Sequence, residues 1–158
     1  MSRKTVSSRR AFLKTAAGAA GAWALGGCRS APRFRKPGEM LKLGVIGTGG
    51  QGHRDWSEMV DCGNVQIVAL CDVDASMFDG AREWYAKKAL KADFRTYADY
   101  RKMLERERDL DAVLVATPDH THAPAAIQAM KRGCHVYVEK PLVRTIWEAR
   151  YFEKVAKE

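Results

Sequence analysis

One glycine-rich segment of this sequence has the spacing of a phosphate-binding loop. Residues 47–52 read Gly-Thr-Gly-Gly-Gln-Gly and match the pattern G-x-G-x-x-G. In such a loop the first glycine, here Gly47, permits a tight turn, and the second, Gly49, lets the backbone approach a pyrophosphate. The third, Gly52, lets the following helix pack closely on the preceding strand. The segment therefore predicts a site for the phosphates of a nucleotide.

The residues on either side of this loop strengthen the prediction. An apolar run at 41–46 precedes it, a helical pattern follows it, and a second apolar run at 65–71 leads into Asp72, twenty residues after Gly52. A helix N-terminus offers unpaired N–H groups to phosphates, and an acid at this distance can accept hydrogen bonds from ribose hydroxyls. Glycine-rich turns alone are common, but strand, turn, helix, strand and acid in this order are typical of a dinucleotide site.

Two further polar segments follow apolar runs later in the chain. Residues 117–124 read TPDHTHAP after the run 112–116, and residues 139–142 read EKPL after the run 135–138. Ligands of parallel α/β sheets bind beyond the carboxyl ends of the strands. Both segments are therefore candidates for the same site as the glycine loop.

Each of these polar residues also has a simpler interpretation. Asp119 or Thr121 could cap the helix that follows them. His120 and His122 are too few, without a third ligand, to indicate a metal site, and we expect none. Lys140, taken alone, could be an ordinary surface lysine.

The hydrophobic pattern predicts the elements that would position these residues. Short apolar runs alternate with helical stripes, as expected of right-handed β–α–β units in a parallel sheet. The predicted strands are 41–46, 65–71, 94–97, 112–116 and 135–138, each followed by a helix. Thr145 and Glu148 predict a capping box on the last helix. We therefore predict an α/β doubly wound parallel sheet (Rossmann) over residues 40–158, with about five of the usual six strands and no room for a separate substrate domain.

These motifs together resemble those of the Gfo/Idh/MocA oxidoreductases, a family named for glucose–fructose oxidoreductase and inositol dehydrogenase. Three segments match in order, GVIGTGGQG at 44–52, ATPDHTHA at 116–123 and EKPL at 139–142, and ALCDVD at 69–74 is also similar. The resemblance covers about residues 41–158, and the Glu-Lys-Pro signature is its most specific part. Family members join an N-terminal nucleotide domain to a C-terminal sheet domain that binds a sugar or cyclitol. The resemblance implies that this second domain is absent here.

The resemblance assigns a role to each matching residue. The residues expected around the pyrophosphate are Gly47, Thr48, Gly49, Gln51 and Gly52. Those expected around the nicotinamide and its ribose are Thr117, Pro118, His122, Glu139 and Lys140. Asp72 would accept hydrogen bonds from the adenosine ribose. The implied cofactor is NAD rather than NADP, because Asp72 would repel a 2′-phosphate and is followed by Val73 and Asp74 rather than by an arginine.

Lys140 is the catalytic residue that the resemblance implies. Removing hydride from an alcohol carbon requires the hydroxyl proton to leave as well, and an ammonium group stabilises the charge that develops on the oxygen. Pro141 would fix the turn that presents the lysine. In the family a histidine, aspartate or tyrosine base usually comes from the C-terminal domain, and nothing here matches it. We therefore expect this chain alone to be inactive.

Three functions fit these motifs. The first is the nucleotide-binding part of a nicotinamide-dependent oxidoreductase acting on a sugar or cyclitol hydroxyl. The sequence leaves open whether such a protein forms a homo-oligomer. The second is an NAD-dependent hidden-redox glycosidase, which oxidises a sugar transiently, eliminates the glycosidic bond and restores the hydride. The third is a nucleotide-binding remnant without turnover. The Glu-Lys-Pro triplet favours the first function.

The charge of the chain is concentrated at its N-terminus. Residues 1–38 carry nine lysines and arginines and no acid, so that the rest of the chain has a net charge of −1 out of the total of +8. A basic tail on a nearly neutral body is not typical of a nucleic-acid-binding domain, and we expect no nucleic-acid partner. The charged residues of 101–108 are expected on a solvated helix face.

The basic tail has the features of an export signal. Residues 8–14, Ser-Arg-Arg-Ala-Phe-Leu-Lys, resemble the twin-arginine motif, and the apolar stretch 15–27 is too short for the roughly 20 residues of a membrane-spanning helix. Residues 22–24 and 25–28 are competing cleavage sites, and the second resembles a lipobox in which Cys28 would be lipidated. We expect a twin-arginine signal at 1–28 and a linker at 29–39. We also expect the twin-arginine export machinery to carry the protein to the periplasm or cell envelope, with membrane contact only through lipid on Cys28.

The remaining cysteines indicate neither a metal site nor a disulfide scaffold. Cys62, Cys71 and Cys134 lack the C-x-x-C spacing of metal sites. Cys71 and Cys134 border apolar strands, so we expect them to be buried thiols.

Overall fold

The computed structural model describes residues 36 and 38–158. The twin-arginine segment, Cys28 and nearly all of the expected linker lie outside these residues. Within the described range, no helix combines the length and apolar character needed to cross a bilayer.

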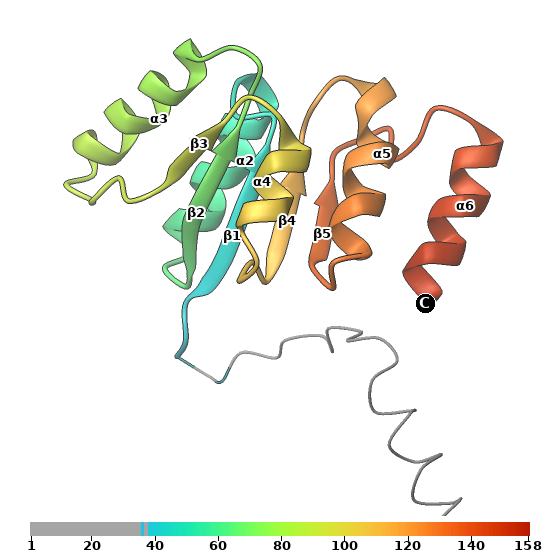
Figure 1. Cartoon of the computed structure of the whole chain (residues 1–158). Coiled ribbons are helices and arrows are strands. Elements are labelled where there is room, and N and C mark those ends of the chain that lie inside the picture. The colour runs from blue at the N-terminus through green and yellow to red at the C-terminus, as the bar shows by residue number, and fades with distance from the viewer. Residues whose placement is uncertain (1–35, 37) are drawn as a thin grey trace, which may run out of the picture. The chain divides into compact units, whose positions relative to one another are not determined.

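The described chain forms the predicted α/β sheet (Figure 1). Its elements, in chain order, are β1 (Leu41–Ile46), α2 (Gly50–Asp61), β2 (Val65–Cys71), α3 (Ser76–Lys87), β3 (Arg95–Tyr97), α4 (Tyr100–Arg106), β4 (Ala112–Val115), α5 (Asp119–Met130), β5 (His135–Val138) and α6 (Ile146–Lys157). All strand pairs are parallel, in the order β3-β2-β1-β4-β5. The strand order reverses between β1 and β4, which is the switch point where such sheets bind ligands.

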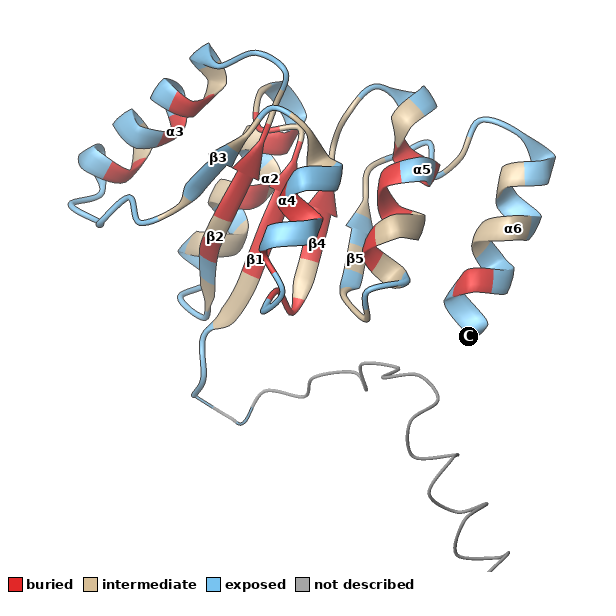
Figure 2. Cartoon of the chain, viewed as in Figure 1, coloured by how far each residue is buried: buried red, intermediate tan, exposed pale blue. Residues whose placement is uncertain are grey.

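Helices cover both faces of the sheet, and each face has its own hydrophobic core (Figure 2). On one face, Trp56 of α2 and Tyr85 of α3 pack against strand residues such as Leu114. On the other face, Met103 of α4 lies in a cluster with alanines of α5, and Phe152 of α6 packs on its edge. The central strands are therefore buried on both sides, as their continuous apolar runs predict.

The helix starts agree with the sequence prediction at α6 but not at α5. Thr145 and Glu148 form the predicted capping box. By contrast, neither Asp119 nor Thr121 caps α5, which begins after Pro118 without a side-chain cap. The Thr121 hydroxyl instead donates to the Pro118 carbonyl at 2.8 Å, and Asp119 already lies in the first turn. There its charge still interacts favourably with the helix dipole.

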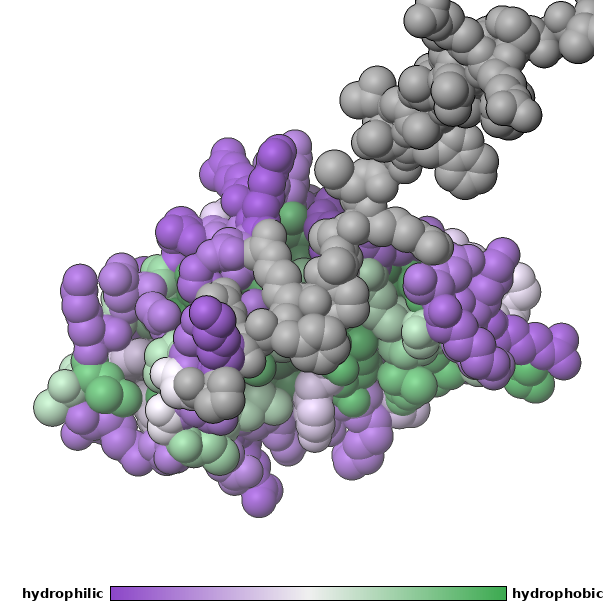
Figure 3. All heavy atoms as spheres, turned by 90° about the horizontal axis from the view of Figure 1, so that it is seen from below, coloured by the Kyte–Doolittle hydropathy of each residue, from purple (hydrophilic) through white to green (hydrophobic). Residues whose placement is uncertain are grey.

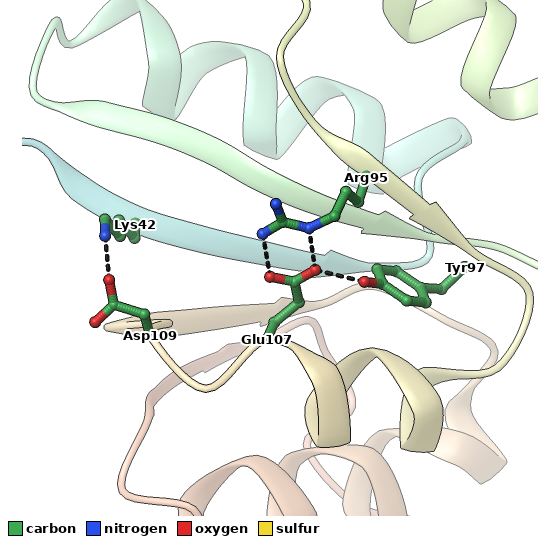
Figure 4. Close-up of polar contacts among 5 residues, drawn as sticks. All are labelled: Lys42, Arg95, Tyr97, Glu107 and Asp109. Carbon is green, nitrogen blue, oxygen red and sulfur yellow. Dashed lines mark hydrogen bonds and ion pairs between the residues drawn. The ribbon is translucent and has the colours of Figure 1, made fainter.

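One predicted surface residue, Glu107, is buried. The charged segment was expected to lie on a solvated helix face, but α4 ends at Arg106, and the Glu107 side chain turns back towards β3 (Figure 4). There it pairs with the Arg95 guanidinium and accepts a hydrogen bond from the Tyr97 hydroxyl. Only 5% of the Glu107 side chain is exposed, and the bonds from Arg95 hold the pKa of its carboxyl below the usual range. This group joins the short edge strand β3 to the end of α4.

Charged side chains lie at the amino ends of the strands. Figure 3, which views the molecule from below, shows polar side chains around smaller apolar areas on this side. At the start of β1 the Lys42 ammonium pairs with Asp109 (Figure 4), and the Lys42 N–H donates to the Asp111 carboxylate at 2.8 Å. These contacts join β1 to the turn before β4.

The three cysteines of the described range are free thiols. Cys71 is buried as predicted, whereas Cys134, just before the edge strand β5, is only half-buried. Burial raises the pKa of Cys71 to about 12, so this thiol is not a nucleophile near neutral pH.

Candidate nucleotide-binding site

The glycine loop is shaped by close backbone contacts. The chain leaves β1 at Gly47, whose φ of 88° favours glycine and whose N–H donates to the Cys71 carbonyl at 2.8 Å. A Cβ at Gly47 would lie 2.5 Å from the Ala116 carbonyl oxygen. A Cβ at Gly52 would lie 2.0 Å from the Gly47 carbonyl oxygen. The first and third glycines of the motif therefore allow α2 to pack on the turn and on the end of β4.

The N-terminus of α2 has the features of an anion site. Gly49 is the N-cap residue, no side chain caps the helix, and its first turn holds no acid. The first N–H groups of a helix have no intrahelical acceptor, and the helix dipole places positive charge at this end. A Cβ at Gly49 would lie 2.4 Å from the Met77 sulfur, so the flexible Met77 side chain lies over the loop.

Asp72 is held rigidly beside this loop. One carboxylate oxygen accepts the Thr48 N–H at 2.7 Å, and the other accepts the Asp74 N–H at 3.1 Å. Thr48 is itself fully buried, and its carbonyl accepts the indole N–H of Trp56 at 3.1 Å. Because each carboxylate oxygen retains a further acceptor position, Asp72 can still bind two neighbouring hydroxyl groups.

A cavity of about 650 Å³ lies at the carboxyl ends of β1, β2 and β4. Of the site residues predicted from the sequence, those that line it are Gly47, Gly49, Asp72, Thr117 and Pro118. Thr48, Gly52 and His122 are buried behind this surface. Gln51, Glu139 and Lys140 do not line this cavity. The structure thus brings the loop, the acid and the segment after β4 together, with the Glu-Lys-Pro segment outside the cavity.

Three residues at the start of α4 line the same cavity and were not predicted from the sequence: Asp99, Tyr100 and Arg101. Asp99 caps α4 by accepting the Arg101 N–H at 2.9 Å, and its carboxylate also binds the Arg101 guanidinium at 2.9 and 3.0 Å. This bidentate pairing keeps the pKa of Asp99 below its usual range. The sequence signal that could have indicated them was an aspartate two residues after the third strand, at the edge where the other polar segments converge.

His122 connects the two polar segments from inside the domain. Only 1% of the residue is exposed. Its Nε2 lies 2.5 Å from the Thr117 carbonyl oxygen, and its Nδ1 lies 2.8 Å from the Pro141 carbonyl oxygen. Both ring nitrogens therefore contact backbone oxygens, so that His122 links the segment after β4 to the Glu-Lys-Pro turn rather than facing the cavity.

The Glu-Lys-Pro segment presents an exposed lysine beside a half-buried glutamate. Lys140 is exposed, and among the described residues its ammonium makes no hydrogen bond or ion pair, so it is available to a ligand. The Lys140–Pro141 peptide bond is cis. One oxygen of Glu139 accepts the Tyr137 hydroxyl at 3.2 Å, and the other lies 3.4 Å from the Lys140 N–H.

A carboxylate that the sequence did not indicate lies on α2, near the glycine loop. Asp55, on the second turn of α2, accepts the Gln51 amide at 2.6 Å and has its other oxygen buried. Burial, with a smaller contribution from the charge of Glu139, raises the pKa of this carboxyl above its usual range. Gln51, which the resemblance places at the pyrophosphate, is thus engaged with Asp55 here.

The donors of the site fit a nucleotide better than a metal ion. The cavity begins at an uncapped helix N-terminus, runs past a backbone that only glycine accommodates and reaches a fixed carboxylate. Throughout residues 38–158, no group of three histidine, cysteine, aspartate or glutamate side chains is placed to hold a metal. This arrangement defines a dinucleotide-binding domain of the Rossmann type.

The chain belongs to the Gfo/Idh/MocA family, because residues 41–158 match that family's profile, described as "Oxidoreductase family, NAD-binding Rossmann fold". It is 36% identical over 113 residues to an alpha-N-acetylgalactosaminidase of Shewanella oneidensis, covering 70% of this chain and 24% of that protein. It is 37% identical over 121 residues to a glycosyl hydrolase family 109 protein of Solibacter usitatus, covering 72% of this chain and 27% of the relative. The chain thus spans about a quarter of the length of these relatives.

Solved structures share the same fold. Myo-inositol 2-dehydrogenase from Lactobacillus plantarum superposes with a TM-score of 0.64 at 31% identity, over 75% of this chain and 33% of that one. A WlbA dehydrogenase from Chromobacterium violaceum, in complex with NADH and UDP-GlcNAcA, has a TM-score of 0.65 at 20% identity, over 83% of this chain and 35% of that one, which indicates the fold alone.

Proposed function

We propose that this chain binds NAD(H) in the cavity at the switch point and serves an oxidoreductase that acts on a hydroxyl group of a sugar or cyclitol. The observation that carries the proposal is the Asp72 carboxylate, fixed by the N–H groups of Thr48 and Asp74 beside the uncapped start of α2. One cavity therefore contains both an acceptor for the ribose hydroxyls and N–H donors for the phosphates.

The adenosine half of the cavity would favour an unphosphorylated ribose. Asp72, Asp74 and Asp99 are three acids on this part of the lining, against the single guanidinium of Arg101. Asp99 already binds that guanidinium in a bidentate pair, which neutralises its charge. A 2′-phosphate would meet the Asp72 carboxylate with no free arginine beside it, which supports NAD(H) over NADP(H).

The other half of the cavity leads from the glycine loop to the segment after β4. The N-terminus of α2 would receive the pyrophosphate, and Thr117 and Pro118 would border the nicotinamide, whose chemistry when bound is to accept or return a hydride. His122 would hold this border in place, because it links the Thr117 carbonyl to the Pro141 carbonyl.

Lys140 would act on the reacting hydroxyl. It is exposed, its ammonium is without a partner in the described range, and it follows Glu139 at the carboxyl end of β5. A hydroxyl that loses hydride from its carbon must also release its proton, and a nearby ammonium stabilises the negative charge that develops on the oxygen. The lysine thus supplies electrostatic stabilisation, and a proton acceptor is required in addition.

The second candidate function is glycoside cleavage by transient oxidation. It is favoured by the similarity to proteins named alpha-N-acetylgalactosaminidase and glycosyl hydrolase family 109. In that reaction the hydride taken from the sugar returns to it after elimination of the glycosidic bond, so that NAD is not consumed. The same residues of this chain would serve both reactions.

Product analysis separates the two candidates. A protein that joins this chain to a substrate-binding domain is incubated with NAD⁺ and panels of free cyclitols, free sugars and aryl glycosides. Both NADH absorbance and released aglycone are followed. Stoichiometric NADH with a free sugar or cyclitol supports the dehydrogenase. Release of aglycone without net NADH supports the glycosidase. If neither product forms and NADH also fails to bind, the proposed function is wrong.

A further inference from the structure

Two threonine hydroxyls form a short chain of hydrogen bonds where the cavity meets the carboxyl end of β4. Thr117 follows β4, Thr121 lies in the first turn of α5, and both line the cavity. The Thr121 Oγ1 lies 2.7 Å from the Thr117 Oγ1 and 2.8 Å from the Pro118 carbonyl oxygen. Both distances are typical of hydrogen bonds between oxygen atoms. The direction of each bond then follows from the number of hydrogens available.

The count of hydrogens fixes the direction of both bonds. A threonine hydroxyl has one hydrogen and two lone pairs, whereas a carbonyl oxygen can only accept. The hydrogen of Thr121 is therefore directed at the Pro118 carbonyl, and the bond between the two hydroxyls uses the hydrogen of Thr117. If Thr121 donated to Thr117 instead, its contact with Pro118 would bring two oxygens together without a hydrogen between them.

Thr117 is held at its main chain as well as at its side chain. Its carbonyl oxygen lies 2.5 Å from Nε2 of the buried His122. In the part of the chain that the structure describes, the only hydrogen bond of the Thr117 hydroxyl is the one with Thr121. A free hydroxyl rotates to donate or to accept as its partner requires. The Thr117 hydroxyl cannot donate to a ligand without breaking its bond to Thr121, so only its lone pairs are available in the cavity.

We propose that Thr117 acts in the cavity as a hydrogen-bond acceptor only, and that it is a specificity-determining residue that selects a nucleotide with an amino group at this place. This inference rests on the proposed function, because it takes the ligand to be a dinucleotide. NAD carries two amino groups, one on the carboxamide of nicotinamide and one on adenine. The proposed function places Thr117 beside the nicotinamide, so the carboxamide is the expected donor.

Four substitutions separate the acceptor from the shape of the side chain. Thr117→Val removes the acceptor and keeps the branched side chain. Thr121→Val removes the group that binds the Thr117 hydrogen, so that the Thr117 hydroxyl becomes free to donate. Thr121→Ser keeps both hydrogen bonds and is the matched control for Thr121→Val. Thr96→Val, on β3 and outside the cavity lining, is the control for the loss of an exposed threonine hydroxyl.

The first experiment measures the affinities for NADH and two analogues by isothermal titration calorimetry. The 3-acetylpyridine analogue has a methyl group in place of the carboxamide amino group, and the hypoxanthine analogue has a carbonyl oxygen in place of the adenine amino group. We expect wild-type protein to bind the acetylpyridine analogue about tenfold more weakly than NADH, the effect of one lost hydrogen bond. Thr117→Val and Thr121→Val should both reduce this ratio to about twofold or less, whereas Thr121→Ser and Thr96→Val should keep it.

The two analogues also show which amino group Thr117 meets. A weaker binding that depends on Thr117 for the hypoxanthine analogue alone would support the acceptor and assign it to adenine. The proposal is overturned if Thr117→Val leaves the ratio unchanged for both analogues. It is also overturned if Thr121→Val and Thr121→Ser give the same ratio.

The second experiment locates the hydroxyl hydrogens without any ligand. Neutron diffraction from crystals of the deuterated full chain should show the deuterium of Thr117 between the two hydroxyl oxygens and that of Thr121 directed at the Pro118 carbonyl. A deuterium of Thr121 directed at Thr117 would contradict the proposal. If wild-type protein binds none of the three dinucleotides, the proposed function fails, while the neutron measurement still decides the direction of the bond between the threonines.

Discussion

Replacement of Gly52 by alanine tests the close packing on which the glycine loop depends. A Cβ at this position would lie 2.0 Å from the Gly47 carbonyl oxygen and 3.1 Å from the Ala116 Cβ. The nearest atom belongs to the backbone of the turn, so no side-chain rotation relieves the contact. Since nonbonded carbon and oxygen atoms need about 3 Å or more, the start of α2 must move away from the turn by about 1 Å.

The expected cost follows from two opposing effects. Alanine in place of glycine within a helix usually stabilises by about 0.5–1 kcal/mol. Forcing an extra carbon into a packed site costs about 1–3 kcal/mol, and backbone contact favours the upper end of this range. We therefore expect Gly52→Ala to lower the free energy of unfolding by about 2 kcal/mol, which lowers Tm by roughly 5–10 °C in a domain of this size.

Urea unfolding followed by fluorescence and circular dichroism measures this change, together with a titration of NADH. Gly80→Ala is the matched control, because Gly80 lies within α3 and a Cβ there would have no atom within 4 Å. We expect Gly80→Ala to be at least as stable as wild type and to bind NADH equally well, and Gly52→Ala to be less stable and to bind more weakly. If the two variants are equally stable and bind alike, the steric account of the third glycine is wrong.

Three further predictions concern other parts of the chain. Glu107→Gln should lower the free energy of unfolding by about 1–3 kcal/mol near pH 7, since it removes the negative charge and one of the two oxygens that accept from Arg95. Because the pKa of Glu107 is lowered in the folded protein, its contribution to the free energy of unfolding is present above the ordinary glutamate pKa. This contribution is lost as pH falls through the pKa of the folded state. The difference in free energy of unfolding between wild type and variant, measured in urea, should therefore shrink in acid and not in alkali. In a protein that joins this chain to a substrate-binding domain, Lys140→Ala should lower turnover by about 10²–10⁴-fold with nearly unchanged NADH affinity. A loss of affinity without loss of kcat would argue for a binding role only. Replacing both Arg9 and Arg10 by lysine should retain the protein in the cytoplasm on cell fractionation, and continued export would contradict the twin-arginine prediction.

Local patterns in the sequence were sufficient to predict the sheet and the glycine loop. The run at 112–116 is apolar at every position because β4 is buried on both faces, and the strands and helices alternate as β–α–β units require. The glycine spacing and the distance to Asp72 depend on one turn of backbone, which the sequence encodes within a few residues.

Contacts between distant segments could not be read from the sequence. Asp99 and Arg101 line the cavity because the start of α4 lies at the same end of the sheet as the glycine loop, and no motif in the sequence marks these two residues. Glu107 looks like part of a charged helix face until the end of α4 is known to turn it towards Arg95. Charged residues near a helix end are therefore the ones whose burial the sequence predicts least well.

The most direct test of the central claim is a comparison of NADH and NADPH binding to wild-type protein and Asp72→Ser by isothermal titration calorimetry. Asp72 accepts two N–H groups in a cavity that holds two further acids and an arginine already paired with Asp99. We predict that wild-type protein binds NADH more tightly than NADPH by about tenfold or more, and that Asp72→Ser removes most of this preference by weakening NADH and strengthening NADPH. Equal or tighter binding of NADPH by the wild-type protein would contradict the assignment of this cavity to NAD.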